Sequence, residues 1–269
     1  MRLAFGVDYL GKDFQGWQSQ KSVPSGQKHL EKAVASVANH PVKVVASGRT
    51  DSGVHALGQV VHVDVQSQRT DYQWLMGVNT NLPNGIALRW VKFVPESFHA
   101  RFSALQRRYV YVLYPDIAPS AIYHDHVLRI HHPLSIKGMQ QAARSLVGEH
   151  DFSAFRSSQC QSKTAIRTVS HLHVYTQGRA IIIDIAANAF LHHMVRNIAG
   201  ALLVVGRGEQ QPAWLNQVLL SKDRRKAAEK VEAKGLYLLE VLYPEQYDLP
   251  KPDLGLFGWD FKHFALAHP

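Results

Sequence analysis

The stretch VKVVASGRTDSGVHALGQVVHVDV, residues 42–65, joins two strand signals through a polar loop. Its first five residues predict a short strand. Residues 59–65 place Val61, Val63 and Val65 on one face, and this alternation predicts a strand with one buried face. Between the two strands lies Ser47–Gly53, which contains an arginine, an aspartate and two glycines. The stretch therefore predicts part of a sheet that carries chemically active groups in a loop.

The rest of the first half mixes strand and helix signals. Apolar residues recur at helical spacing in Gln27–Asn39, where Leu30, Val34 and Val37 share one face. The sequence Asn-Leu-Pro-Asn-Gly at 81–85 predicts a turn. The other elements expected here are a strand at Arg2–Tyr9, a helix at Tyr72–Val78 and a strand at Ile86–Val94.

The second half repeats this order of elements. We expect a strand at Gln106–Tyr114, a helix at Ser135–Leu146, a hairpin of Val169–Thr176 and Ala180–Ala187, a helix at Phe190–Val205 and a strand at Tyr237–Val241. Two α+β halves in similar order indicate an internally duplicated architecture whose two sheets can join.

The chain is accordingly expected to have three parts. The N-terminal α+β half, residues 1–105, carries the polar loop, and the C-terminal α+β half covers residues 106–246. The tail, residues 247–269, is rich in proline, which predicts irregular structure. We expect the tail to pack on the body because of its large apolar residues, which are Leu256, Phe257, Trp259, Phe261 and Phe264.

The charge balance points to an anionic partner. Among 269 residues, 30 are Lys or Arg and 21 are Asp or Glu, which gives a formal net charge of +9 and a pI near 9.6. Such an excess favours a polyanion through counterion release, although an anionic membrane surface attracts a basic protein as well. Charge alone leaves both partners open.

Other features argue against several classes of protein. The longest apolar runs, such as Ala180–Ala187, are far shorter than the about 20 residues of a membrane span. Asp8 comes too early for a secretory signal peptide. The single cysteine, Cys160, excludes an internal disulfide and fits a reducing compartment, so we expect a cytoplasmic protein. Histidines occur in pairs without metal-ligand spacing, and packed or solvated histidines are favoured over a metal site.

The polar loop has the residue types of a catalytic site. If Ser47, Arg49 and Asp51 are extended, their alternation places all three side chains on one face. Arg49 then keeps the Asp51 carboxylate ionised. An ionised, partly desolvated carboxylate serves as a nucleophile or stabilises a cationic transition state. The alternative is a structural ion pair that fixes the loop.

The loop also resembles, as ASGRTDSGVHA at 46–56, the active-site motif of the TruA family of tRNA pseudouridine synthases. Other segments match the family's motifs in the family's order, from about residue 7 to residue 243. They are FQGWQ at 14–18, FHARFSA at 98–104, RRYVY at 107–111, GEHDFS at 148–153, CQSK at 160–163, FLHHMVRN at 190–197 and GLYL at 235–238.

The resemblance implies an enzyme that isomerises a uridine already in RNA. The bond from ribose C1′ to uracil N1 is cut, the base turns, and C5 bonds to C1′, without a metal or other cofactor. Asp51 matches the family's nucleophile, which attacks C1′ or C6; the sequence leaves both routes open.

Two further residues are implied in catalysis. Tyr109 matches a tyrosine that lies against the target base and relays the proton leaving C5. Arg196 matches an arginine that pairs with the nucleophile. By the residues alone, the alternative for Tyr109 or Tyr111 is a packed core tyrosine, and the alternative for Arg196 is a surface residue that extends its charge to water.

The resemblance also implies how RNA binds. A target base in a stem or stacked loop must leave the stack, and Arg49 is expected to fill the vacated space or clamp the flipped nucleotide. Side chains that suit phosphates or donate hydrogen bonds follow in two segments. The residues expected along the RNA are Phe98, His99, Ala100, Arg101, Phe102, Gln159, Cys160, Gln161, Ser162 and Lys163. Lys222–Lys226 is predicted to start a helix and to be either a solvated face or a phosphate contact.

The fold implied is α+β, with two similar α/β halves whose antiparallel-rich sheets join into one mixed sheet around a central basic cleft. The family acts as a homodimer on uridines 38, 39 and 40 of the tRNA anticodon stem-loop. Two rivals remain: a pseudouridine synthase with another RNA target, and a non-catalytic RNA-binding module.

Overall fold

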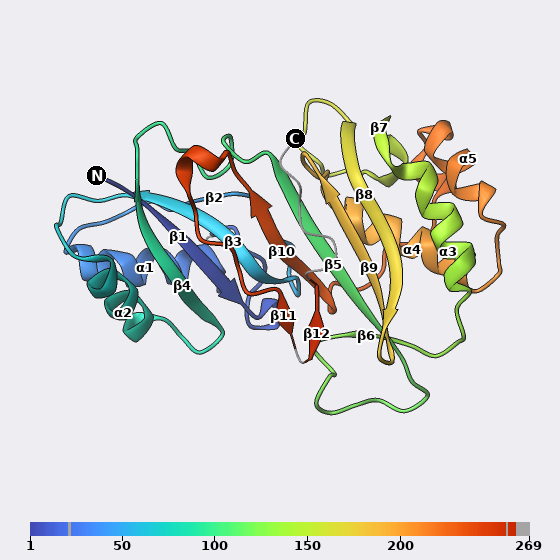
Figure 1. Cartoon of the computed structure of the whole chain (residues 1–269), viewed down its shortest axis with the longest axis horizontal. Helices are drawn as coiled ribbons and strands as arrows, with labels where there is room; N and C mark the ends of the chain where they lie inside the picture. Colours follow the sequence, from blue (N-terminus) through green and yellow to red (C-terminus); the bar gives the residue numbers. More distant parts are fainter. Residues whose placement is uncertain (21–22, 257, 262–269) are drawn as a thin grey trace. The chain divides into compact units, whose positions relative to one another are not determined.

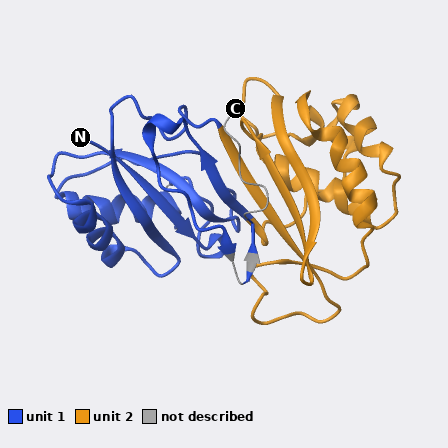
Figure 2. Ribbon diagram, in the orientation of Figure 1, with its two compact units in different colours: residues 1–105, 237–269 blue, residues 106–236 orange. Residues whose placement is uncertain are grey.

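The structure is a computed structural model that describes residues 1–20, 23–256 and 258–261 (Figure 1). It divides into two compact units (Figure 2). Unit 1 contains Met1–Leu105 together with the described residues from Tyr237 onward, and unit 2 contains Gln106–Leu236. The predicted division of the chain into residues 1–105, 106–246 and 247–269 stays a prediction, because the two compact units do not test it.

Unit 1 is a mostly antiparallel sheet with two helices. Its main strands lie in the order β4 (Ile86–Val94), β1 (Arg2–Tyr9), β3 (His55–Asp64) and β10 (Leu236–Leu242). Strand β1 is antiparallel to both of its neighbours, β10 is parallel to β3, and the short β2 (Val45–Ala46) also pairs with β3. Helices α1 (Gly26–Ala38) and α2 (Asp71–Asn81) contact each other, and α2 also packs on β4 (Figure 1).

Local sequence explains where these helices begin. Ser25 caps α1, since its Oγ accepts a hydrogen bond from the backbone N–H of Lys28 at 3.3 Å. Thr70 and Gln73 form a reciprocal capping box at the start of α2. These caps satisfy backbone donors that the first turn of each helix leaves without partners.

Strand β3 differs from the sequence prediction. It begins at His55 rather than Gln59, and both of its faces are buried up to Val63. The second face is covered because His62 packs against the rings of Phe98 and His99, which come from the segment after β4. A single buried face was therefore the wrong expectation for this strand.

Unit 2 repeats the pattern of a sheet with helices. Its main strands follow the antiparallel order β5 (Gln106–Pro115), β9 (Ala180–Ala187), β8 (Ile166–Gln177) and β7 (Gly148–Asp151). The short β6 (Leu128–Ile130) runs parallel to β5. The helices are α3 (Ile136–Ala143), α4 (Met194–Gly206) and α5 (Ala213–Ser221).

Helix α4 starts four residues later than predicted. His193 precedes it with φ of 64°, a left-handed conformation that cannot continue a helix. Phe190–His193 is therefore irregular chain, and the helix proper begins at Met194. The basic stretch Lys222–Lys226 is not the start of an α-helix either: Lys222 ends α5 with φ of 53°, and Arg224–Lys226 forms one 3₁₀ turn.

The tail is described only in part. Tyr247, Leu254 and Phe261 are buried, and β11 (Gly255–Leu256) pairs with β12 (Trp259–Asp260). Phe257 and Phe264, which also motivated the packing prediction, lie outside the described residues.

The α+β class, with antiparallel-rich sheets in two halves of similar order, is confirmed. The central basic cleft stays a prediction. Within the described part of the chain, no helix combines the length and the apolar character that crossing a membrane requires.

Candidate active site

The loop that carries Asp51 is fixed from both of its ends. Ser47 is buried, and its Oγ donates to Oε1 of Gln59 at 2.6 Å. The Gln59 amide in turn donates to the carbonyl of Gly48 at 3.0 Å. On the other side of Arg49, Thr50 Oγ1 shares a 2.8 Å hydrogen bond with the hydroxyl of Tyr9. The backbone around Arg49 and Asp51 is therefore held by buried side chains.

The FQGWQ segment braces the same loop. The backbone N–H of Trp17 donates to the carbonyl of Thr50 at 3.1 Å. Gly16 has φ of 86°, and a Cβ there would lie 3.1 Å from that same carbonyl oxygen, so a larger residue would strain the contact. This packing gives a physical reason why the chain carries both glycine-containing motifs, which are far apart in sequence but in contact in the fold.

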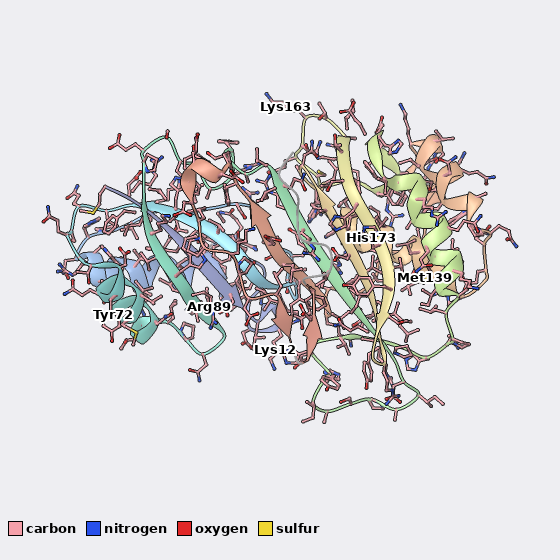
Figure 3. The ribbon with its side chains drawn as sticks, viewed as in Figure 1. Lys12, Tyr72, Arg89, Met139, Lys163 and His173 are labelled. Carbon is pink, nitrogen blue, oxygen red and sulfur yellow. The ribbon has the colours of Figure 1, made fainter. Side chains whose placement is uncertain are left out.

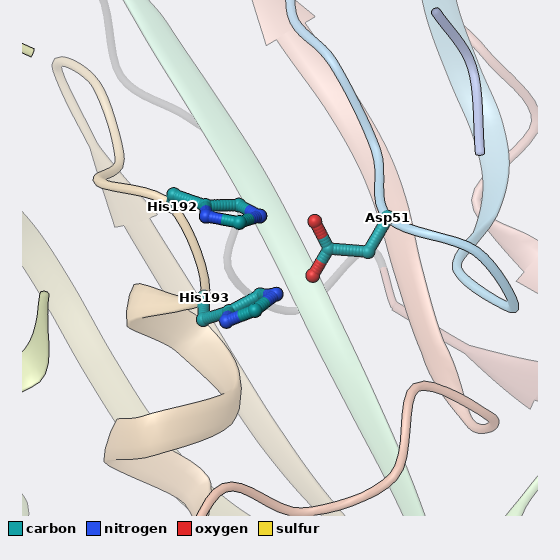
Figure 4. Close-up of side chains that lie close together, drawn as sticks. All are labelled: Asp51, His192 and His193. Atoms are coloured by element: carbon teal, nitrogen blue, oxygen red, sulfur yellow. The ribbon is translucent and has the colours of Figure 1, made fainter. Parts of the chain in front are cut away.

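The loop does not present one uniform face. Ser47 is buried, Arg49 is exposed and Asp51 is half-buried. The chain bends at Ser47 and turns after Asp51, whose carbonyl accepts from the N–H of Val54 at 3.1 Å. The condition for aligning all three side chains, an extended chain, is therefore not met at Ser47. Figure 4 shows the Asp51 carboxylate projecting from this loop.

In unit 2 the two tyrosines of RRYVY have different environments. Tyr111 is fully buried and donates from its hydroxyl to the carbonyl of Glu232. Burial raises the pKa of Tyr111, although Arg196 acts in the opposite direction. Tyr109 is 9 % exposed, and its ring lies edge-on to Phe190 with centroids 5.1 Å apart. Tyr111 is thus the more deeply buried of the two.

Arg196 lies in the first turn of α4 and is half-buried. Its Nε donates to the carbonyl of Val231 at 2.9 Å, which fixes the direction of the guanidinium group. The chain before this helix holds a histidine pair: the rings of His192 and His193 pack with centroids 3.8 Å apart (Figure 4). The N–H of His192 donates to Sγ of Cys160 at 3.4 Å.

The segment Phe98–Phe102 is a rigid turn in unit 1. Nδ1 of His99 accepts from the backbone N–H groups of Arg101 and Phe102, both at 3.2 Å. The His99 and Phe102 rings stack at 4.4 Å, and the Arg101 guanidinium lies 5.6 Å from the Phe102 centroid. Phe98 and Ala100 are buried, whereas Arg101 and Phe102 are exposed. Phe98 and Ala100 thus anchor the turn, and Arg101 and Phe102 are accessible to a ligand.

His62 organises this turn, and sequence reasoning missed it. Its Nδ1 accepts from the N–H of Ala100 at 3.1 Å, while Tyr243 donates to the Ala100 carbonyl at 2.6 Å. Burial, with the positive charge of Arg2, lowers the pKa of His62 to about 4. The ring is therefore a neutral acceptor at pH 7. A histidine within a strand of valines was the only signal for it.

The loop with Gln159–Lys163 is held by Arg156. One guanidinium nitrogen of Arg156 donates to the carbonyls of Cys160 and Ser162, at 2.8 and 2.7 Å. The Ser162 hydroxyl donates to the Thr164 carbonyl at 3.1 Å and is thus engaged within the loop. Gln159, Gln161 and Lys163 are exposed, and Lys163 points outward (Figure 3).

Cys160 is half-buried in this loop. Burial raises the pKa of its thiol, but hydrogen bonds from the backbone of His192 and Ser162 and from Arg156 outweigh that effect and hold the pKa below its ordinary value.

The chain is similar in sequence to known proteins. The sequence pattern of a family described as "tRNA pseudouridine synthase" matches residues 7–103 and 142–244. Among curated proteins, the chain is 51% identical over 254 residues to tRNA pseudouridine synthase A of Enterobacter sp. (strain 638), covering 94% of each chain. It is 52% identical to the protein of that name from Pseudoalteromonas atlantica, covering 95% of this chain and 97% of the relative.

Among solved structures, a chain of a Cbf5-Nop10-Gar1 complex aligns with a TM-score of 0.35 and 14% identity, covering 75% of this chain and 45% of that one. The relatives at about half identity are full-length matches, and the family pattern contains the Asp51 loop, the Phe98–Phe102 turn and the start of α4. The resemblance seen in the motifs is thereby confirmed: this chain belongs to the tRNA pseudouridine synthase family.

Proposed function

We propose that this protein converts uridine to pseudouridine at positions 38, 39 and 40 of the tRNA anticodon stem-loop, with Asp51 as nucleophile and the target nucleotide flipped out of its stack. Membership of the family makes the chain an isomerase that acts on uridine in tRNA. The position of the target uridine, the nucleophile and the flipping are the proposal. The observation that carries the proposal is the sequence match over both units, to the family pattern and to relatives named tRNA pseudouridine synthase A.

The local geometry supports Asp51 as the reactive group. A nucleophile must be held in place and yet reach the substrate. The buried hydrogen bonds of Ser47 and Thr50 hold the loop, while the Asp51 side chain is only half-buried. A carboxylate on such a loop attacks C1′ or C6, and the geometry is compatible with either route.

The reaction itself is an isomerisation. The C1′–N1 bond breaks, C5 bonds to C1′, the proton leaves C5, and N1 gains a proton, so no oxidant or external energy is needed. Tyr109 is the less deeply buried of the two tyrosines, 9 % exposed and edge-on to Phe190, and this partial exposure supports a role for its phenol. We assign it to stacking on uracil and to relaying the C5 proton. Arg196 is assigned to holding Asp51 ionised and oriented.

RNA binding is assigned to three places. Arg49, which is exposed, fills the gap left by the flipped nucleotide or clamps that nucleotide. The displayed pair Arg101 and Phe102 offers a charge for phosphate and a ring for stacking. The exposed side chains of the Gln159–Lys163 loop supply hydrogen bonds and a further cation. The five remaining predicted members of these segments are buried or half-buried and are assigned to holding the backbone of the two segments; they are Phe98, His99, Ala100, Cys160 and Ser162.

The experiment that tests the nucleophile is Asp51→Asn. The variant is expected to keep tRNA affinity, since a negative charge is removed, and to lose tritium release from C5-labelled uridine in tRNA. The control is Ser52→Ala, an exposed neighbour in the same loop, which should stay active. Release by Asp51→Asn at the wild-type rate would end the assignment.

The same assay separates the rival functions. A non-catalytic RNA-binding module would release no tritium in the wild-type protein and would be indifferent to Asp51→Asn. A synthase with another RNA target would be active, but mapping of pseudouridine in total RNA would place the modification outside tRNA positions 38–40. Homodimer formation and cytoplasmic localisation stay predictions, and light scattering at several protein concentrations tests the first.

A further inference from the structure

Unit 2 contains a basic pocket that includes Gln159 of the proposed RNA-binding loop and three cations to which the proposed function gives no role. Its volume is about 640 Å³, and it opens beside the first turn of α4. Three cationic side chains line it: Arg156, Arg224 and Lys230. Ser157 and Asn197 add polar groups, and no carboxylate is among the described lining residues. Three positive charges facing one space repel each other unless an anion lies between them.

Arg224 is held in the pocket by neutral groups. One guanidinium nitrogen donates to Oδ1 of Asn197 at 3.0 Å, and another donates to the carbonyl of Ala227 at 3.3 Å. Asn197 is buried and donates to the carbonyl of Phe155 at 2.8 Å, which fixes it as the pocket floor. These contacts orient the Arg224 charge and do not neutralise it.

Arg156 is anchored in the same manner. Arg156 donates to the backbone carbonyls of Cys160 and Ser162, both of which are uncharged. Lys230 is exposed at the rim of the pocket. The guanidinium groups of Arg156 and Arg224 have no carboxylate partner among the residues that the structure describes.

The carboxylates nearest in sequence to Arg156 and Arg224 are engaged elsewhere. Asp223 pairs with Arg225 at 2.8 Å, outside the pocket lining. Asp151 pairs with Lys222 at 3.2 Å and accepts from Ser153. The fold thus supplies counter-charges to Lys222 and Arg225 and leaves Arg156 and Arg224 for a ligand. The N-terminal end of α4 adds a positive partial charge at the same place.

We propose that this pocket binds a backbone phosphate of the tRNA substrate, with Arg156, Arg224 and Lys230 as its cations and the Ser157 hydroxyl as a donor. The inference rests on the proposed function, because that function supplies the polyanionic ligand. Arginine suits this role since its planar fork makes two parallel hydrogen bonds to phosphate oxygens. The pocket acts in substrate binding and positions the RNA chain rather than the reacting base.

The test uses Lys230→Glu in the full-length protein. Lys230 is exposed, so its replacement should leave the fold intact. The matched control is Lys137→Glu, an exposed cation of α3 that does not line the pocket and lies outside the predicted RNA-binding segments. Lys230→Glu is expected to weaken tRNA binding about tenfold more than the control and to reduce the salt slope of binding by about one unit.

Phosphate-ethylation interference provides a second readout. Wild-type protein should show a phosphate whose ethylation weakens binding, and that signal should vanish in Lys230→Glu and Arg224→Ala but persist in Lys137→Glu. Equal behaviour of Lys230→Glu and Lys137→Glu in both assays would overturn the inference. Thermal unfolding of Arg224→Ala, with Arg224→Lys beside it, separates a lost ligand contact from a lost fold.

Two further measurements distinguish RNA binding from binding of a free anion, and failure of the pocket from failure of the proposed function. If inorganic phosphate raises the melting temperature of the wild type but not of Arg224→Ala, while both bind tRNA equally, the pocket holds a free anion and the RNA assignment is wrong. Pseudouridine formation is measured in the same wild-type preparation. An active enzyme with unaffected Lys230→Glu refutes only the pocket, whereas an inactive wild type with weakened Lys230→Glu binding refutes only the proposed function.

Discussion

Two tyrosines on one strand face differ in how deeply they are buried. Tyr111 is fully buried and donates to the carbonyl of Glu232, whereas Tyr109 is 9 % exposed and is the tyrosine proposed to act in catalysis. The two hydroxyl groups are therefore expected to matter for different quantities.

Replacing each tyrosine by phenylalanine tests this difference. Tyr109→Phe keeps the ring against Phe190 and removes only the hydroxyl, so kcat should fall about 10²-fold or more while stability changes little. Tyr111→Phe leaves the carbonyl of Glu232 without its donor and should cost about 1–2 kcal/mol in the free energy of unfolding. Single-turnover kinetics and urea unfolding measure the two effects, and the reverse split would contradict the assignment.

His62 is expected to make stability depend on pH. Its pKa in the folded protein is about 4, below the ordinary 6.5, so the unfolded chain binds more protons between these values. The contribution of His62 is fully present above pH 6.5 and is lost as pH falls toward 4. Allowing for partial screening by solvent, the wild type should lose about 1–2 kcal/mol between pH 7 and pH 5.

The comparison variant is His62→Gln, whose side-chain oxygen can accept from the N–H of Ala100 but does not titrate. Urea unfolding at both pH values should show a smaller loss for this variant. Equal losses in the two proteins would mean that other groups cause the pH dependence.

At the scale of elements, strands β5, β9 and β8 are joined by a buried ion pair. Arg108 donates to both carboxylate oxygens of Asp184, at 2.9 and 2.6 Å, and both side chains are fully buried. His171 lies 2.9 Å from the same carboxylate. Burial raises the pKa of Asp184, but the hydrogen bonds from Arg108 and His171 outweigh it and keep the pKa below its ordinary value.

Breaking this pair from one side should be costly. Arg108→Met leaves a buried carboxylate without its main partner and is expected to destabilise the protein by about 3–5 kcal/mol. The double variant with Asp184→Leu removes both charges and should recover most of that loss. A double-mutant cycle in urea measures the coupling energy between the two side chains. Additive losses would show that the ion pair does not cause the loss of stability.

The whole molecule carries a net charge of +9, and its affinity for a polyanion should depend strongly on salt. Charges that touch phosphates contribute to the slope of log affinity against log salt, and charges elsewhere contribute little. The turn that displays Arg101 is one place where a contact is expected.

Arg101→Ala should lower the steepness of that slope by about one unit, because one phosphate contact is lost. Lys28→Ala, an exposed cation of α1 outside the predicted RNA-binding segments, is the control and should leave the slope unchanged. Titration of labelled tRNA at several salt concentrations measures both, and identical slopes for all three proteins would remove Arg101 from the interface.

Much of the fold was predictable because its signals are local. The strands Arg2–Tyr9 and Ile86–Val94 have the predicted bounds, since alternation and flanking turns depend only on neighbouring residues. The start of α4 was not predictable, because a histidine in the left-handed conformation interrupts a sequence that is otherwise helical. The second buried face of β3 was also missed, as it depends on the distant segment Phe98–Phe102.

The sequence by itself determined the α+β class, the basic character and, through its motifs, the family. Only the tertiary structure decided which polar residues are buried and hold the fold, and which are exposed to solvent or to a pocket. His62 became a buried acceptor, Tyr111 a core residue, and Arg156 and Arg224 two cations in one pocket. The physical reason is that burial and hydrogen-bond partners come from segments far apart in the chain, whereas charge and periodicity are properties of the chain itself.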